Sequence, residues 1–189
     1  IRFTYFDGSK EVKIPYWIEP VDYVTITLIP QGDDDSNVGT KDSDCSKNPQ
    51  FKYYYCKHYC QPADWYKINY DDSSWNVGVT PFAGVSGNPN FQFACTNTLN
   101  SAPDDLFVRK EFYLSTLPVT GKLYLAYDDG IRCYLNENLI VDALNEAHGP
   151  SYWNKIVDIP GNYFRLGKNV LACWVANGGE NSGSGSGAL

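Results

Sequence analysis

The chain has 189 residues, of which 22 are acidic and 15 are basic, and its formal net charge at pH 7 is −7. This length suits one domain with an appended arm, and the acidic balance excludes the basic surfaces that bind nucleic acid or anionic membranes. Its 16 Gly and 11 Pro interrupt the sequence too often for long helices, whereas 15 Tyr, 9 Phe and 5 Trp favour strands. We therefore expect an all-β fold with a helical turn only at residues 142–148. No membrane insertion is expected, since no apolar run reaches about 18 residues.

Three short β-like runs open the chain, at residues 1–6, 11–18 and 24–29. We assign residues 1–30 to an N-terminal β arm. The next segment, residues 31–50, is polar and rich in Asp, Ser, Gly and Lys, which is typical of an exposed loop or linker.

Six cysteines and no methionine indicate the compartment in which the protein works. An even number of cysteines in a chain rich in Tyr, Asn and Gly favours disulfides and an oxidising environment. We therefore expect an extracellular protein, either secreted or at the cell surface. The sequence starts at Ile1 without a signal-peptide pattern, so we expect a mature or excised part of a longer product.

The cysteines fall into two groups. Cys133 and Cys173 lie centrally in two strand-like segments, so we expect them to pair with each other. The remaining four are expected to pair among themselves, in a connectivity that the sequence leaves open: Cys45, Cys56, Cys60 and Cys95.

A zinc site is an alternative for part of the second group. Cys56, His58 and Cys60 offer thiolate and imidazole ligands, which suit zinc. Their spacing is not that of a zinc-ribbon pair, and an extracellular setting oxidises thiols. We favour the disulfides.

The most strand-like stretch of the chain is residues 121–141. Apolar side chains alternate over residues 123–127 and 131–135, and a further strand starts at Leu139. Between the first two runs, Asp129-Gly130 supplies the turn chemistry of a tight hairpin, because Gly reaches positive φ without steric cost. The pattern predicts an antiparallel meander.

Five motifs follow one another between residues 66 and 178: Asp71 to Trp75, Leu106 to Phe112, Leu123 to Leu139, Tyr152 to Asn154 with Val157 to Ile159, and Gly167 to Gly178. In this order they resemble the galactose-binding-domain-like jelly roll, a β-sandwich found as an accessory domain of many glycoside hydrolases and in carbohydrate-binding modules. The resemblance implies a jelly-roll β-sandwich over residues 51–178, with a strand-rich N-terminal arm and a Gly/Ser-rich tail at residues 179–189.

Two features depart from the family pattern. Asn136-Glu137-Asn138 stands where the family usually has Asn-Gly, so we expect Asn rather than Gly in the left-handed position. After Gly178 no apolar strand follows, which leaves open that the sandwich lacks its last strand within this chain. An open sheet edge would accept another strand, and the N-terminal arm of the same chain or of a neighbouring copy could supply it.

The first functional hypothesis is a non-catalytic module for carbohydrate binding or adhesion, with glycans or glycoproteins as partners. Sugars stack their C–H faces on aromatic rings, while Asp and Asn bind their hydroxyl groups. We expect Trp75 and Trp174 to be core residues, because both lie within framework motifs. Candidate binding residues on loops are Trp65, Tyr152, Trp153, Asn154 and Tyr163. For Trp153 a core position is an equally good interpretation.

The alternative is a structural subunit of an extracellular fibre or appendage. Such a subunit would join copies of itself by strand addition through the N-terminal arm and by disulfides, and contacts of this kind can produce filaments. A solvent-facing arm without a partner is the competing interpretation of the same residues.

We do not expect an enzyme. Three adjacent acidic pairs, Asp71/Asp72, Asp104/Asp105 and Asp128/Asp129, are candidates for acid–base chemistry. Glycosidase carboxyls are about 5 to 9.5 Å apart across a cleft, whereas neighbours on a strand point to opposite faces. No G-x-S-x-G motif is present.

No cofactor is required by these patterns, but structural calcium is a candidate. Jelly rolls resembling this one often hold calcium in a loop, through carboxylate and carbonyl oxygens. The alternative is that these acidic turns are simply solvated. The candidate ligands are Asp33, Asp34, Asp35, Asp71 and Asp72.

Overall fold

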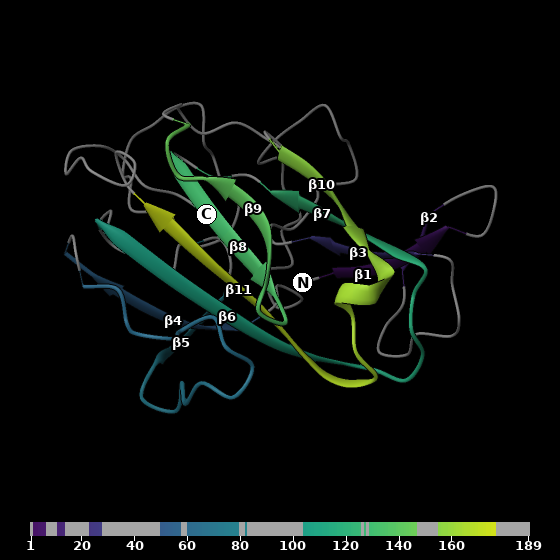
Figure 1. The fold of residues 1–189 in the computed structure, drawn as a ribbon, viewed down its shortest axis with the longest axis horizontal. Coiled ribbons are helices and arrows are strands. Elements are labelled where there is room, and N and C mark those ends of the chain that lie inside the picture. Colours follow the sequence, from purple (N-terminus) through teal and green to yellow (C-terminus); the bar gives the residue numbers. More distant parts are fainter. Residues whose placement is uncertain are drawn as a thin grey trace.

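The computed structural model describes residues 2–6, 11–13, 23–27, 50–57, 60–79, 82, 104–125, 127, 129–146 and 155–176, and all statements below concern these residues. They form strands, joined by turns and one short 3₁₀ turn at Gly161–Tyr163 (Figure 1). The strands are β1 (Arg2–Phe6), β2 (Glu11–Lys13), β3 (Tyr23–Thr27), β4 (Gln50–Cys56), β5 (Asn76–Val79), β6 (Asp105–Leu114), β7 (Thr120–Leu125), β8 (Gly130–Leu135), β9 (Asn138–Ala143), β10 (Lys155–Pro160) and β11 (Gly167–Ala176).

The strands build two sheets that pack face to face, so the predicted all-β sandwich is confirmed. One sheet has six strands in the order β5-β4-β6-β11-β8-β9, and all of its pairs are antiparallel. The other has five strands in the order β10-β7-β3-β1-β2, where β3 runs parallel to β7. The N-terminal strands therefore complete a sheet of their own chain.

The core between the sheets comes from alternating side chains of both layers. Leu123 and Leu125 of β7 contribute from the five-stranded sheet, and Val108 of β6 and Ile131 of β8 contribute from the six-stranded sheet. All four are almost completely buried, as expected when every second residue of a strand faces the opposing layer.

The central strand β11 is buried on both faces. Leu171, Cys173 and Val175 face the five-stranded sheet, whereas Val170, Ala172 and Trp174 belong to a second hydrophobic cluster on the outer face. A strand buried on both faces has a continuous apolar sequence rather than an alternating one, as this strand does. The outer face of the six-stranded sheet must therefore be covered.

The predicted meander over residues 121–141 is only partly correct. β8 and β9 do form an antiparallel hairpin, but β7 belongs to the other sheet, so the chain crosses between layers near Asp129. Positive φ falls on Asp129 (65°) rather than on Gly130. A Cβ on Gly130 would lie 2.3 Å from the carbonyl oxygen of Leu144, so Gly is needed there for close packing.

Residues 142–148 do not begin with the predicted helical turn. Asp142 and Ala143 are the last residues of β9, and a non-helical turn follows at Leu144 and Asn145. Cross-strand pairing with β8 outweighs the weak helical preference of this short segment. Residues 147 and 148 lie outside the described part.

Two disulfides are present among the described cysteines. Cys133 of β8 and Cys173 of β11, the pair expected from the sequence, lie directly opposite each other and are bonded. Cys56 and Cys60 form the second bond, at the end of β4. Cys45 and Cys95 lie outside the described residues. Because disulfide sulfurs are not thiolate ligands, the zinc interpretation of Cys56 and Cys60 is wrong for this oxidised state.

Candidate functional site

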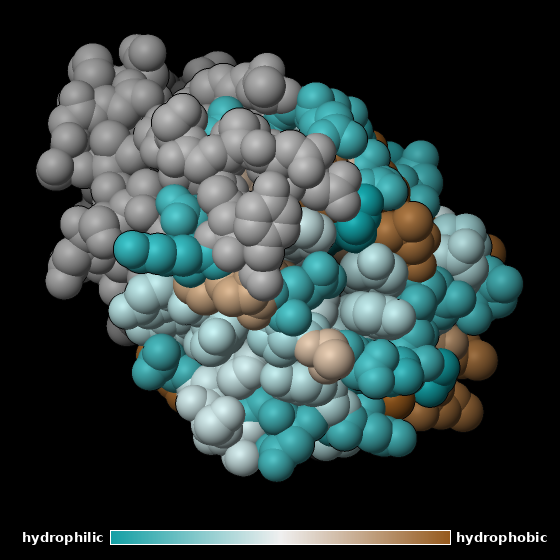
Figure 2. Space-filling view, turned by 60° about the vertical axis from the view of Figure 1, so that its left-hand side comes forward, coloured by the Kyte–Doolittle hydropathy of each residue, from teal (hydrophilic) through white to brown (hydrophobic). Residues whose placement is uncertain are grey.

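Residues 60–75, which we call the cover, form a loop across the outer face of the six-stranded sheet. Trp65 and Trp75 of the cover belong to the same buried cluster as Phe107 of β6 and Trp174 of β11. The Trp65 ring meets the Phe107 ring edge-on, with 5.1 Å between centroids. In the view of Figure 2, the coloured part of the surface is mostly hydrophilic to neutral, with separate hydrophobic areas. Trp65 and Trp75 are 0% and 6% exposed, so these two rings of the cover point inward.

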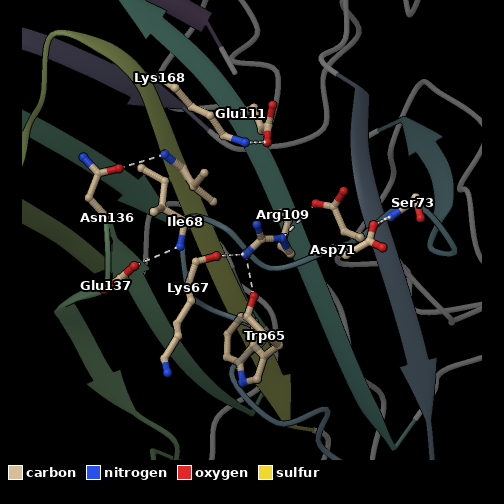
Figure 3. Close-up of polar contacts among 12 residues, drawn as sticks. Trp65, Lys67, Ile68, Asp71, Ser73, Arg109, Glu111, Asn136, Glu137 and Lys168 are labelled. Carbon is tan, nitrogen blue, oxygen red and sulfur yellow. Dashed lines mark hydrogen bonds and ion pairs between the residues drawn. The ribbon is translucent and has the colours of Figure 1, made fainter.

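A buried arginine holds the cover in place. Arg109 of β6 is almost completely buried, and its Nε donates a 2.8 Å hydrogen bond to Asp72 Oδ2. Its Nη1 donates to the carbonyl oxygens of Trp65, at 2.5 Å, and Lys67, at 3.1 Å (Figure 3). The guanidinium also lies 5.3 Å from the centre of the Tyr70 ring. A buried cation is tolerated only with such partners, so Arg109 and the cover fold together.

The β8–β9 hairpin makes a second attachment to the cover. Its turn residues Asn136 and Glu137 have φ values of 49° and 73°, so Asn is in a left-handed conformation as expected, and Glu137 is too. The carboxylate of Glu137 accepts a 3.1 Å hydrogen bond from the backbone N–H of Ile68 (Figure 3). A Glu residue is strained at positive φ, and here the strained residue is the one that makes the contact to the cover.

Two buried asparagines connect this hairpin to the start of β11. Asn136 Nδ2 donates to Asn169 Oδ1 at 2.6 Å and to the Tyr163 carbonyl oxygen at 2.9 Å, while Asn136 Oδ1 accepts from the Val170 N–H. Asn169 in turn bonds the backbone of Arg165 through both side-chain atoms. Since their side-chain oxygens and amide groups all have partners, these polar groups specify the geometry of the turn.

One residue of the cover and three residues of β8 and β9 form a partly exposed group, which we call the tyrosine–arginine patch: Tyr66, Arg132, Tyr134 and Asp142. Tyr66 of the cover stacks on Tyr134 of β8, with 4.4 Å between ring centroids and 19° between planes. Arg132 and Tyr134 alternate with the buried Cys133, so they share the outer face. Asp142 of β9 is the cross-strand partner of Arg132.

An ion pair forms the polar half of the patch. Arg132 Nε and Nη2 both approach Asp142 Oδ1, at 2.9 Å each, and the two side chains are 22% and 47% exposed. The guanidinium also lies 5.7 Å from the centre of the Trp174 ring. This contact places the guanidinium over a ring of the outer cluster.

The phenol of Tyr134 is kept neutral. Burial raises the pKa of Tyr134 above its usual value, the Arg132 charge lowers it, and Tyr66 and Asp142 raise it again. The net shift is upward, so the hydroxyl remains a hydrogen-bond donor throughout the neutral and mildly alkaline range. The other three side chains of the patch therefore all influence the pKa of Tyr134.

The structure places the sequence-predicted binding residues apart. Trp65 is 0% exposed, so its ring is not available to a sugar, and the prediction for this residue is wrong. The reason is that the cover folds back onto an apolar sheet face. Tyr163 packs partly against the core between the sheets, on the opposite side of the six-stranded sheet. Tyr152, Trp153 and Asn154 lie outside the described residues. Trp75 and Trp174 are core residues, as predicted.

The candidate calcium ligands in the described part have protein partners. Asp71 Oδ1 accepts a 3.0 Å hydrogen bond from the Ser73 N–H (Figure 3). Hydrogen bonding first from the Ser73 side chain and then from its backbone lowers the pKa of Asp71, and Asp72 pairs with Arg109. Asp33, Asp34 and Asp35 lie outside the described residues, so calcium binding stays a prediction. In the part of the chain that is described, no helix has the length and apolarity to cross a membrane.

Sequence reasoning missed all four residues of the patch. The period-two alternation over residues 131–135 was enough to place Arg132 and Tyr134 on one face. The partnership with Asp142 was hidden, because it depends on a register shift between Cys133 and Tyr134. The position of Tyr66 depends on the path of the cover, which short-range patterns do not encode.

No protein-family model and no curated protein matches the chain. Among solved structures, the chain is similar to a glycosyl hydrolase family 2 member from Bacteroides cellulosilyticus, with a TM-score of 0.48 and 20% identity over 75% of this chain. It is also similar to a beta-glycosidase from Bacteroides vulgatus, with a TM-score of 0.45 and 17% identity over 75% of this chain. A beta-glucuronidase from Bifidobacterium dentium matches with a TM-score of 0.45 and 14% identity over 69% of this chain. The matched region covers 20%, 19% and 20% of those chains, respectively. Likeness at this level concerns the fold, and no activity of this chain follows from it.

Proposed function

We propose that this chain is a non-catalytic, extracellular β-sandwich module that binds carbohydrate at a cell surface or matrix. The observation that carries the proposal is the tyrosine–arginine patch, where half-exposed aromatic rings lie beside an ion pair. Aromatic rings stack on the C–H faces of a sugar, and its hydroxyl groups both donate and accept hydrogen bonds. The patch offers both kinds of contact on one surface.

The ion pair is well suited to hydroxyl recognition. Both donors of Arg132 converge on Asp142 Oδ1, which leaves Asp142 Oδ2 outside this ion pair. A sugar hydroxyl can donate to a carboxylate oxygen and accept from an arginine N–H. Tyr134 adds a neutral phenol to the same surface.

The carboxylates considered for catalysis support a non-catalytic role. Asp72 is paired with the buried Arg109, and Asp105 accepts a 2.8 Å hydrogen bond from Trp174 Nε1 inside the outer cluster. Asp71 accepts from the Ser73 N–H. These three of the considered carboxylates therefore have structural partners within the fold.

An extracellular location and a jelly-roll type of sandwich are parts of the same proposal. Two disulfides among the described cysteines fit an oxidising compartment. The 2.6 Å hydrogen bond between Asn136 and Asn169 joins two of the motifs that resemble the galactose-binding-domain-like jelly roll. This contact gives those motifs a shared structural role.

The experiment is a glycan array probed with the wild-type protein and with Tyr66→Ala. Loss of the partly exposed Tyr66 ring should weaken binding about tenfold, because an aromatic contact of this kind contributes about 1.4 kcal/mol. Tyr113→Ala is the matched control, since Tyr113 is exposed on the same sheet but lies on β6, at its opposite end from the patch. Equal binding by all three proteins, or no binding by wild type, would contradict the proposal.

The structural-subunit alternative has less support. It needs an N-terminal arm that is available to a neighbouring copy, whereas β1, β2 and β3 already pair within the five-stranded sheet of their own chain. Light scattering on the purified protein separates the two proposals. A monomer is expected for the binding module, and ordered filaments for the structural subunit.

A further inference from the structure

We propose that Asp142 makes the tyrosine–arginine patch selective for uncharged glycans over acidic ones. This inference rests on the proposed function and adds the class of ligand. An unpaired arginine beside aromatic rings would favour sugars that carry carboxylate or sulfate groups, because guanidinium binds such anions through two parallel hydrogen bonds. In this structure the charge of Arg132 is neutralised before any ligand arrives.

The pairing is built into the sheet register. Arg132 and Asp142 are cross-strand partners in β8 and β9, and two nitrogens of the guanidinium approach one oxygen of Asp142 at 2.9 Å each. The Trp174 ring lies beneath the guanidinium, and the edge of this ring donates its N–H to the carboxylate of Asp105. Arg132, the only cation of the patch, is thus paired with one carboxylate and lies over a ring that is hydrogen-bonded to a second carboxylate.

An acidic sugar would bring a further negative charge against Asp142. For unit charges about 5 Å apart, the repulsion from Asp142 taken alone lowers affinity roughly fourfold in water and up to a few hundredfold at the dielectric of a protein surface, and it offsets the attraction that the paired Arg132 exerts on the same anion. The net charge of −7 acts in the same direction over longer distances. A neutral sugar avoids this repulsion and still uses the rings and hydroxyl contacts.

The test compares a polyuronate oligosaccharide with its carboxyl-reduced, uncharged counterpart, by calorimetry on wild type and Asp142→Asn. Wild type should prefer the uncharged ligand. Asn keeps the shape of Asp but frees the charge of Arg132, so the variant should shift the preference toward the polyuronate by about tenfold or more. This gain should fall at high salt, because screening weakens exposed charge contacts.

Asp158→Asn is the matched control. Asp158 pairs with Lys122 on the five-stranded sheet, at 3.3 Å, so this variant makes the same change in net charge away from the patch. It should leave the ligand preference unchanged. Arg132→Gln is a second variant, independent of the folding of Asp142→Asn. It removes the only cation of the patch, so its preference for the uncharged ligand should rise further.

The outcomes separate this inference from the proposed function. If wild type binds the polyuronate better, and Tyr66→Ala weakens that binding about tenfold, the patch is a glycan site but the proposed selectivity is wrong. Equal shifts in Asp142→Asn and Asp158→Asn would overturn the role of Asp142, because net charge alone would then explain them. If wild type binds neither these ligands nor any glycan of the array, both proposals fail.

Discussion

Arg109 attaches the cover to the six-stranded sheet through several contacts of one side chain. It bonds one carboxylate and two backbone carbonyl oxygens from a buried position. Planar guanidinium geometry allows several hydrogen bonds in different directions at once, which a lysine ammonium on a flexible stem does not reproduce. Arg109 therefore both pairs its charge with a carboxylate and fixes the backbone of the cover.

Arg109→Met should lower the free energy of unfolding by about 3 to 5 kcal/mol, because Asp72 and two carbonyl oxygens lose their partner. Urea denaturation followed by tryptophan fluorescence measures the change. Arg165→Met is the control, since Arg165 is exposed, and it should stay within about 0.5 kcal/mol of wild type. A loss below about 1 kcal/mol for Arg109→Met would show that the cover is held by its tryptophans instead.

Glu137→Gly should change the free energy of unfolding in two opposite ways. Gly adopts a φ of 73° without the steric cost of about 1 kcal/mol that an L side chain meets there. The same change removes the hydrogen bond from Ile68, so global stability should change little while the cover loosens locally. Amide hydrogen exchange should accelerate at Ile68 and remain unchanged in β11. Unaltered exchange at Ile68 would mean that the carboxylate does not hold the cover.

Tyr127 introduces a dependence of stability on alkaline pH. Burial, together with the 2.8 Å hydrogen bond to Glu146, raises the pKa of Tyr127 well above its ordinary 10.0. The folded state therefore holds this proton more tightly than the unfolded chain. Its contribution is complete below pH 10 and is lost as the pH rises toward the folded-state pKa.

Tyr127→Phe should flatten this alkaline decline. Urea unfolding at intervals between about pH 8 and 11 measures it, and the difference in stability between wild type and variant should shrink above about pH 10. Part of the decline should remain in the variant, because the pKa of Tyr134 is also raised. Parallel curves for the two proteins would show that Tyr127 ionises equally in the folded and unfolded states.

At the scale of strands and loops, local sequence patterns predicted where strands lie along the chain better than which strands pair with one another. Alternating apolar residues located β8 and β9, and the arm runs located β1, β2 and β3. The layer in which each strand lies was not predictable, because Asp129-Gly130 has the composition of a hairpin but serves a crossing between sheets. A crossing between sheets needs the same local features as a hairpin, which here are a positive φ at Asp129 and a close backbone approach at Gly130.

The exposure of the aromatic residues was also misjudged from sequence. Trp65 lies in a segment rich in polar and turn residues, which suggested a ligand-facing loop. A signal against this was present in residues 170–176, whose continuous apolar character indicates a strand covered on both faces. Something had to lie over that outer face, and the tryptophans of the cover do.

The two disulfides should differ in what they contribute to stability. Bonded residues are 40 apart for Cys133 and Cys173 but only 4 apart for Cys56 and Cys60. Loop-closure entropy then gives about 4 and about 2 kcal/mol, respectively. Paired Cys→Ala substitutions at each site, compared by urea denaturation, measure the two values. A larger loss at the shorter loop would mean that anchoring the start of the cover outweighs chain entropy.

At the scale of the whole molecule, the N-terminal strands are part of the sandwich. β3 lies between β7 and β1, so only β7 and β10 of the five-stranded sheet come from the rest of the chain. Without the arm, the backbone groups of β7 would be exposed along one edge.

Deletion of residues 1–30 should therefore abolish the soluble folded monomer. A two-stranded layer covers too little of the core between the sheets, and an exposed edge strand promotes aggregation. Size-exclusion chromatography and near-ultraviolet circular dichroism of the truncated protein provide the measurement. A monomer with the wild-type spectrum would mean that the remaining chain is a complete domain.

The bond between β8 and β11 also governs how the molecule responds to mechanical load. It joins directly opposed residues of neighbouring strands, with a sequence separation of 40. Pulling on the two ends of the chain cannot extend the segment between these sulfurs, which holds about 130 to 145 Å of contour length. β9 and β10 therefore lie within a loop shielded from tension, and Arg132 and Cys133 lie at its boundary. A protein tethered under flow would keep this hairpin region together while other strands peel away.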